Sequence, residues 1–273
     1  IALPTLVTVL IPEDERDRAN GMIGATMGVS FTITSVFSGL AIGQLGMGWA
    51  LVLATLASVG ATAHLLTIRV PEDQPAPAGE HEPMIDVRGA LTAIRQVPGL
   101  LGLIGFAACN NLLGGVFMSL MDAYGLELVS VEAWGILWGF LSFGFIVGGL
   151  IVARFGLGGR PLRLVLAGNL VGWLVCTLFS VRSSILLLTI GMFVWMVVIP
   201  IVEAAEQTVL QRAVPFEQQG RVFGFAQTVE NAATPLTAFL VGPLAEAVFV
   251  PFMTTGRGVD LIGDWFGTGK ERG

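Results

Sequence analysis

The hydrophobic pattern divides the chain into seven apolar stretches of about twenty residues or more, separated by polar turns. They lie at about 21–43, 47–68, 99–121, 133–154, 162–181, 184–206 and 222–250. About twenty helical residues cross the hydrocarbon core of a bilayer. Backbone groups cannot stay unpaired in lipid, and these continuous runs lack the alternation of barrel strands. The pattern therefore predicts seven membrane-spanning helices.

The composition agrees with an integral membrane protein. Of the 273 residues, 54% are apolar and 12% are charged, and the mean hydropathy is +0.79. Soluble domains carry about 25% charged residues. Many of the 36 glycines lie inside the apolar stretches, where small residues let membrane helices approach closely. Three Gly-x3-Gly pairs are therefore predicted contact ridges, for static or sliding packing: Gly39/Gly43, Gly135/Gly139 and Gly144/Gly148.

The basic residues alternate with the apolar stretches. Up to residue 250, Arg182 stands on one side of the predicted membrane. Ten arginines stand on the other side: Arg16, Arg18, Arg69, Arg88, Arg95, Arg154, Arg160, Arg163, Arg212 and Arg221. The positive-inside rule assigns the arginine-rich side to the cytoplasm. We expect a multi-pass protein of the inner (cytoplasmic) cell membrane, with its starting loop inside and its tail outside.

Two hydrophilic segments interrupt the apolar pattern. Residues 70–97 have the Pro, Glu and Ala content of a flexible cytoplasmic linker. Within it, Asp86–Gln96 is predicted to form a short amphipathic helix on the membrane surface. The tail 254–273 has apolar residues at helical spacing, among them Ile262 and Trp265. This spacing predicts an interfacial helix on the outer surface.

An internal repeat links the two ends of the chain. Val214–Glu246 matches the region around the first apolar stretch at an offset of 203 residues. The matching pairs are Pro12/Pro215, Arg18/Arg221, Gly21/Gly224 and Gly39/Gly242. Each copy leads from a polar turn into a long apolar helix. A unit of about 200 residues in a chain of 273 residues predicts a piece of a longer protein.

A cytoplasmic linker between two halves that repeat at this distance resembles the major facilitator superfamily of secondary transporters. Residues 148–156 (GGLIVARFG), followed by Gly159-Arg160-Pro161, are similar to the superfamily's cytoplasmic loop motif between helices eight and nine. Arg154, Gly156 and Arg160 match that motif. Ala153 stands where the motif has an acid, so the role of that acid is not carried over.

The resemblance implies an all-α polytopic bundle of the major facilitator type, truncated at both ends. Residues 1–69 would hold the end of helix four with helices five and six. Residues 98–273 would hold helices seven to eleven and the outer-surface tail. The opening PEDERDRANG and the turn that begins at Pro215 look most like bacterial drug-efflux and siderophore-exporter branches.

Three glutamates inside the apolar stretches are candidates for proton coupling, because acids at membrane depth are costly and usually face a cavity or a partner. Glu230 stands beside Asn231, and its alternative role is a buried hydrogen-bond partner of nearby asparagines (Asn110, Asn111 or Asn169). Glu203 and Glu206 lie one turn apart on one helix face. Two close carboxylates disfavour joint ionisation.

For Glu203 and Glu206 we expect a gate, in which one of them pairs with Arg160 when the cavity faces outward and releases it when the cavity faces inward. The alternative is a structural clamp that does not move. Arg163, Arg212 and Arg221 also lie on the predicted cytoplasmic side and are possible cationic partners for either role.

Polar and aromatic residues suggest a substrate cavity. Asn110 and Asn111 precede a Gly114-Gly115 step, which suits a broken helix that lines a cavity; the alternative is hydrogen bonding between helices. Asn231, Phe117 and Trp195 are further candidates for the lining, the aromatic ones as a surface for a bulky apolar compound. Packing or lipid-facing positions are the alternative for most of the aromatic residues.

The expected function is proton-coupled export of small amphipathic compounds by alternating access. The alternatives are an uptake symporter or lipid transporter on the same fold, or a membrane receptor or scaffold without transport. The sequence contains no Gly-x4-Gly-Lys-Ser/Thr, no metal-ligand cluster and no nucleophile elbow. We therefore expect no enzyme activity, no cofactor, no metal and no nucleic-acid partner. The expected partners are a small-molecule substrate, protons and the lipid bilayer, and the whole protein is expected to be a monomer.

Overall fold

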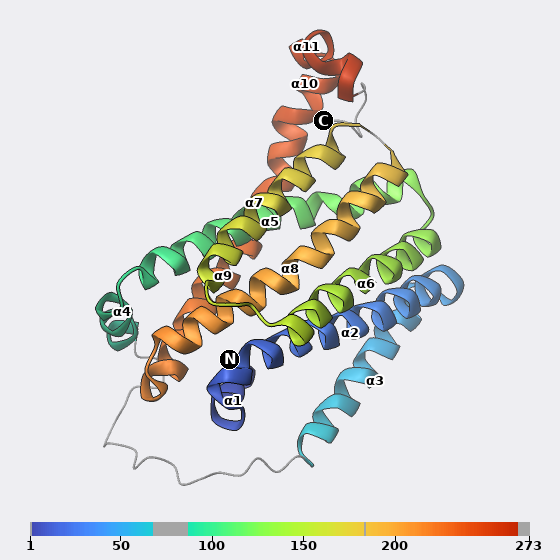
Figure 1. Ribbon diagram of the computed structural model, residues 1–273. Helices are drawn as coiled ribbons and strands as arrows, with labels where there is room; N and C mark the ends of the chain where they lie inside the picture. Colours follow the sequence, from blue (N-terminus) through green and yellow to red (C-terminus); the bar gives the residue numbers. More distant parts are fainter. Residues whose placement is uncertain (1, 68–86, 183, 267–273) are drawn as a thin grey trace.

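The computed structural model describes residues 2–67, 87–182 and 184–266, and the secondary-structure elements in them are helices (Figure 1). Within the described residues, seven helices are long and apolar enough to span a membrane, which confirms the predicted number. They are α2 (Arg16–Leu45), α3 (Met47–Leu65), α5 (Leu100–Leu128), α6 (Val131–Phe155), α7 (Pro161–Ser180), α8 (Ile185–Ala213) and α9 (Phe216–Leu244). Four extend well beyond one end of their apolar stretches: α2 begins at Arg16, α9 begins at Phe216, α5 ends at Leu128 and α8 ends at Ala213. Hydropathy marks the part of a helix that suits lipid, whereas the helix itself continues through polar turns.

The short elements stand at the ends of the long helices. They are α1 (Ala2–Leu10), the 3₁₀ turn η1 (Glu13–Glu15), α4 (Val87–Gln96), the π-helical turn η2 (Ala245–Phe249), α10 (Val250–Thr254) and α11 (Arg257–Phe266). The predicted helices in the linker and in the tail are thus present as α4 and α11. The rest of the predicted linker, 70–86, and residues 267–273 of the tail lie outside the described residues.

The two copies of the repeat begin with the same backbone conformation. Pro12 precedes η1 and α2 with φ −53° and ψ 149°, and Pro215 precedes α9 with φ −54° and ψ 143°. Proline fixes φ near this value and lacks the N–H that the first helical turn would leave unpaired. The repeated proline therefore marks the same kind of helix start in both copies.

The predicted glycine ridges lie at close helix contacts. Helices α2 and α6 run side by side along their length (Figure 1). A Cβ added to Gly39 would lie 2.8 Å from the Cα of Gly135, and one added to Gly43 would meet the side chain of Glu132. On another face of α6, a Cβ added to Gly148 would lie 2.7 Å from the Pro200 ring of α8. Small residues at these positions are thus what allows α2, α6 and α8 to approach, as the spacing predicted.

One hydrophobic core lies at the end of the bundle where α2 and α9 begin and where α6 and α8 end. We call this the basic end, because Arg16, Arg154 and Arg212 are at these helix ends. The core joins residues of α4, α5, α6, α7, α8 and α9. Ile94 of α4 is fully buried in it. The apolar face of α4 therefore packs on α9 and α5.

A second core fills the opposite half of the bundle. It contains Trp134, Phe145, Phe179 and Met192, with Phe117 and Trp195 packed against it. Helix α3 behaves differently, since none of its residues is buried. The two cores thus hold α5 to α9 together.

Candidate functional site

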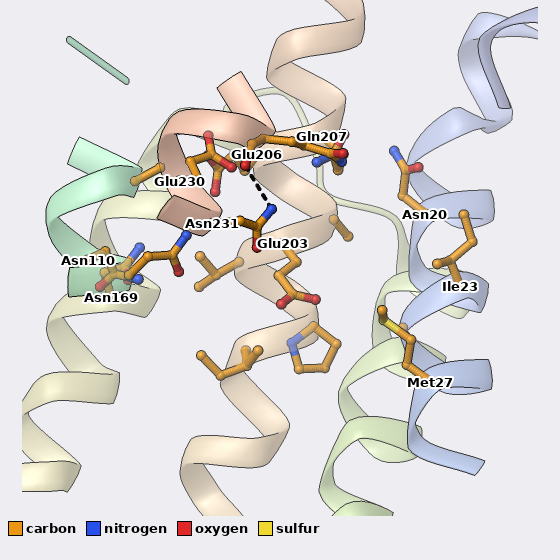
Figure 2. Close-up of a pocket in the computed structure, with 18 of the residues that line it drawn as sticks. Asn20, Ile23, Met27, Asn110, Asn169, Glu203, Glu206, Gln207, Glu230 and Asn231 are labelled. Carbon is orange, nitrogen blue, oxygen red and sulfur yellow. Dashed lines mark hydrogen bonds between the residues drawn. The ribbon is translucent and has the colours of Figure 1, made fainter. Parts of the chain in front are cut away.

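A cavity of about 490 Å³ opens where α2, α5, α8 and α9 come together, with one residue from α7 (Figure 2). Its apolar wall includes Ile23, Met27, Phe106, Ile199 and Pro200. Ten polar or acidic residues line the rest: Asn20, Asn110, Asn111, Asn169, Glu203, Glu206, Gln207, Gln227, Glu230 and Asn231. None of the described residues that line it is basic. The cavity is thus amphipathic, with carboxylates as its charged groups.

The structure brings all three predicted glutamates to this cavity. Glu203 and Glu206 point into it from adjacent turns of α8, and Glu230 reaches it from α9 (Figure 2). Glu206 lies within electrostatic range of both Glu203 and Glu230. Three carboxylates from two helices therefore share one space.

The carboxylate of Glu230 is incompletely satisfied. Its Oε1 atom is buried and has no hydrogen-bond partner in the described part of the chain. A buried acceptor normally has a partner, because losing hydrogen bonds to water without replacement costs about 1–3 kcal/mol. The alternative role in which Glu230 bonds to Asn110, Asn111 or Asn169 is not seen, since no hydrogen bond in the described chain joins them. Glu230 is available to a proton or to a ligand.

The path of α8 positions the two other acids. Pro200 is buried inside this helix, three residues before Glu203. Its missing N–H removes one bond of the helix ladder. The ring fits against two glycines, since a Cβ on Gly24 of α2 would lie 2.8 Å from it and one on Gly148 of α6 would lie 2.7 Å from it. Pro200 therefore fixes α8 against both neighbours just before the helix presents its acids.

The predicted amides also reach the cavity. Asn110 accepts a hydrogen bond from the indole N–H of Trp173 at 2.7 Å. The amide of Asn231 donates to the Gln227 carbonyl at 2.8 Å, and that of Asn169 donates to the Val165 carbonyl at 2.9 Å. These bonds restrict how the amides can turn toward a ligand.

Phe117 and Trp195 do not line this cavity. Their ring centroids are 5.6 Å apart, and Phe117 also contacts Phe179 at 5.6 Å. They pack on the core away from the basic end, which agrees with the packing alternative. Helical spacing predicts on which face of its helix a residue lies, but it does not predict which neighbouring helix packs on that face.

The loop-motif residues lie at the basic end. Arg154 is exposed, with its Cζ 5.6 Å from the Phe155 ring centroid. Gly156 ends α6 with φ +69°, and the Asp17 carboxylate lies where its Cβ would point. Arg160 is exposed just before α7, and Arg221 is half-buried in the first turns of α9. No ion pair joins Arg160 to Glu203 or Glu206 in the described residues, so the predicted pairing does not occur in this conformation.

Asn20 is a cavity residue that the sequence reasoning missed. It stands in the polar run PEDERDRANG, which hydropathy assigned to a turn before the first span. Helix α2 begins at Arg16, so Asn20 already lies in its second turn and faces α8. The sequence did contain one signal for this position, because an asparagine within one turn of the start of an apolar stretch can already belong to the helix.

The chain is similar in sequence to known proteins. The sequence model of the Major Facilitator Superfamily matches residues 1–238. An uncharacterized MFS-type transporter, y4rN of Sinorhizobium fredii (strain NBRC 101917 / NGR234), is 25% identical over 263 residues. That alignment covers 92% of this chain and 63% of the relative, so the chain spans less than two thirds of the relative's length. No solved structure matches the chain significantly.

Proposed function

Because the chain belongs to the Major Facilitator Superfamily, we propose that its protein is a secondary transporter that exports small amphipathic compounds in exchange for protons. Transporters of this fold move one helical bundle against the other around a site near the membrane midplane. The observation that carries the proposal is the shared cavity of Glu203, Glu206 and Glu230.

The three carboxylates favour binding of protons in the cavity. Burying an acid in a membrane helix costs about 3 kcal/mol on insertion scales, and mutual repulsion adds to the cost of ionising neighbouring acids. Among the described residues, no basic side chain lines the cavity to offset this cost. Protons or cationic ligands are therefore the means of neutralising it, and Glu230, with its unpartnered Oε1, is the first candidate to exchange one for the other.

The same lining favours amphipathic compounds that carry a basic nitrogen. The carboxylates attract the cationic group, and the amides offer donors and acceptors around it. Ile23, Met27 and Phe106 provide apolar surface for the remainder of the molecule. Methionine suits a variable ligand, because its flexible side chain adapts to different shapes.

Competition for the carboxylates supplies the coupling. A proton that enters from the outer side displaces the cation, and the cation that enters from the cytoplasm displaces the proton. The proton gradient then drives export of the cation, provided that the protein does not switch between its outward-facing and inward-facing states while the cavity is empty and charged. Asn110, Asn111 and Asn231 orient the bound compound in this scheme, and the carboxylates hold either the proton or the cation.

The test uses the full-length protein in proteoliposomes with an imposed pH gradient and an internal pH-sensitive dye. Hydrophobic cations and uncharged compounds of similar size are added in parallel. We expect proton flux with the cations that falls at least about tenfold in Glu230→Gln, since the amide cannot release a proton.

A matched control is Glu217→Gln, because Glu217 is exposed in the first turn of the same helix and lies outside the cavity. This variant is expected to keep the wild-type flux. Flux that is unchanged in Glu230→Gln moves the coupling role to Glu203 or Glu206. A wild-type protein that moves no protons with any cation contradicts the proposal and favours a different substrate class or a protein without transport.

A further inference from the structure

Asn20 makes hydrogen bonds between helices that are far apart in the sequence. It is 6% exposed, and its Nδ2 donates to Thr208 Oγ1 at 3.2 Å and to Gln211 Oε1 at 3.0 Å. Both partners belong to α8 and are buried, with 1% and 3% exposure. An amide nitrogen has two hydrogens to donate, and α8 takes both.

These bonds stand at the boundary of the cavity. Asn20 is itself a lining residue, together with Glu206 and Gln207 of α8. Figure 2 shows it on α2, across from the α8 acids. Thr208 and Gln211 follow these acids toward the basic end, so the bonds lie between the cavity and that end of the bundle.

A second polar contact joins the same end of α2 to the loop that follows α6. Asp17 Oδ2 accepts the backbone N–H of Leu157 at 3.0 Å. Leu157 is in the α6–α7 loop, within the stretch that resembles the superfamily's loop motif. A carboxylate of α2 thus holds the backbone of this loop.

Close glycine packing runs along the whole α2–α6 contact. Gly39 packs on Gly135 at one end, and a Cβ on Gly21 would lie 2.7 Å from the Ala153 backbone nitrogen near the basic end. The hydrogen bonds of Asn20 and Asp17 are added to this packing at the basic end. Such bonds can be exchanged for bonds to water when a gap opens, so they can be broken and remade in each cycle.

We propose that Asn20 is a latch residue that closes the basic end of the cavity by its bonds to Thr208 and Gln211, with Asp17 as an auxiliary contact. Opening toward that end requires α2 to separate from α8, and the Asn20 bonds must then break. This inference rests on the proposed alternating-access function, because a latch has a role only in a protein that opens.

The experiment measures access to the cavity from the basic end of the full-length protein. Gln227, a half-buried lining residue of α9, is replaced by cysteine in a background with Cys109→Ser and Cys176→Ala. A membrane-impermeant maleimide is applied to inside-out and to right-side-out vesicles, with and without a pH gradient. The rate of labelling is the readout.

Asn20→Leu keeps the side-chain size and removes the donors. We expect it to raise labelling in inside-out vesicles about tenfold, the shift given by losing one to two ordinary buried hydrogen bonds. Gln211→Leu provides a second variant with the same expected effect if Asn20→Leu is poorly folded. Because the two residues share a bond, the double variant should label no faster than the faster single variant.

Ser142→Ala is the control, since it removes a buried hydroxyl whose hydrogen bond goes to Trp138 in its own helix. It should label at the wild-type rate. If wild-type labelling responds to the gradient but Asn20→Leu and Gln211→Leu both label at the wild-type rate, the latch is wrong and alternating access stands. Wild-type labelling that stays on one side whatever the gradient overturns both proposals.

Discussion

The Asn110 side chain of α5 accepts a hydrogen bond from the indole N–H of Trp173 on α7, at 2.7 Å. This bond engages the amide oxygen of Asn110, so the amide N–H₂ is the part left for the cavity. Helix α7 thereby fixes the rotamer of Asn110, although the only residue of α7 among the described lining residues is Asn169. Trp173 would act on a ligand indirectly, through Asn110.

The variant Trp173→Phe removes the N–H and keeps most of the ring. We expect a loss of about 0.5–1.5 kcal/mol in the free energy of unfolding, the usual net value of one hydrogen bond. We also expect weaker ligand binding, because Asn110 is then free to rotate. Thermal unfolding in detergent and equilibrium binding of a fluorescent hydrophobic cation measure the two effects. Trp138→Phe is a control away from the cavity lining, and an identical loss of binding in it would argue against a specific role for Trp173.

The glycine contact between α2 and α6 predicts a steric effect. A Cβ on Gly39 would lie 2.8 Å from the Gly135 Cα, which is closer than carbon atoms pack. Gly39→Ala is therefore expected to lower the free energy of unfolding by about 1–3 kcal/mol. Gly102→Ala meets no atom within 4 Å and should be neutral or stabilising by up to about 1 kcal/mol. Thermal unfolding of both variants in the same detergent compares them, and equal stability of the two would mean that the α2–α6 contact is looser than the structure indicates.

Much of this arrangement could be predicted from the sequence. Continuous apolar runs long enough to cross a bilayer predicted all seven long helices, and the cost of acids in lipid singled out Glu203, Glu206 and Glu230. The sequence could not predict which residues of other helices each side chain contacts. Asn20 was missed because the first turns of α2 are polar, and its partner Gln211 is 191 residues away. Phe117 and Trp195 were expected at the cavity, but the rings that cover them come from other helices.

Replacement of Glu206 is expected to have opposite effects on stability and on transport. It lies within electrostatic range of two other acids, so replacing it removes repulsion whenever more than one of them is ionised. We expect Glu206→Gln to raise the free energy of unfolding by about 1 kcal/mol, in the range of single close charge interactions. Cation-dependent proton flux should fall in the same variant. Thermal unfolding and the proteoliposome assay give the two readouts on one preparation.

The exposed Glu217 offers the comparison for Glu206, because its replacement by Gln removes a carboxylate outside the cavity. Stability and flux should both stay near the wild-type values in Glu217→Gln. If Glu206→Gln lowers stability, its carboxylate has a favourable structural role, and the clamp alternative for Glu203 and Glu206 would replace the coupling role.

The burial of Ile94 makes a prediction about the segment before α5. Ile94 is fully buried in the basic-end core although α4 follows the polar linker. If α4 is a fixed part of the bundle, Ile94→Ala removes buried methyl groups and should cost about 2–5 kcal/mol. If α4 only rests on the membrane, the same change would cost far less. Thr92→Ala is the matched control, because Thr92 is exposed on the other face of this short helix and should change stability by less than about 0.5 kcal/mol. Thermal unfolding of the two variants decides between these roles, and the fixed role means that any movement of α9 carries α4 with it, since the two helices pack together.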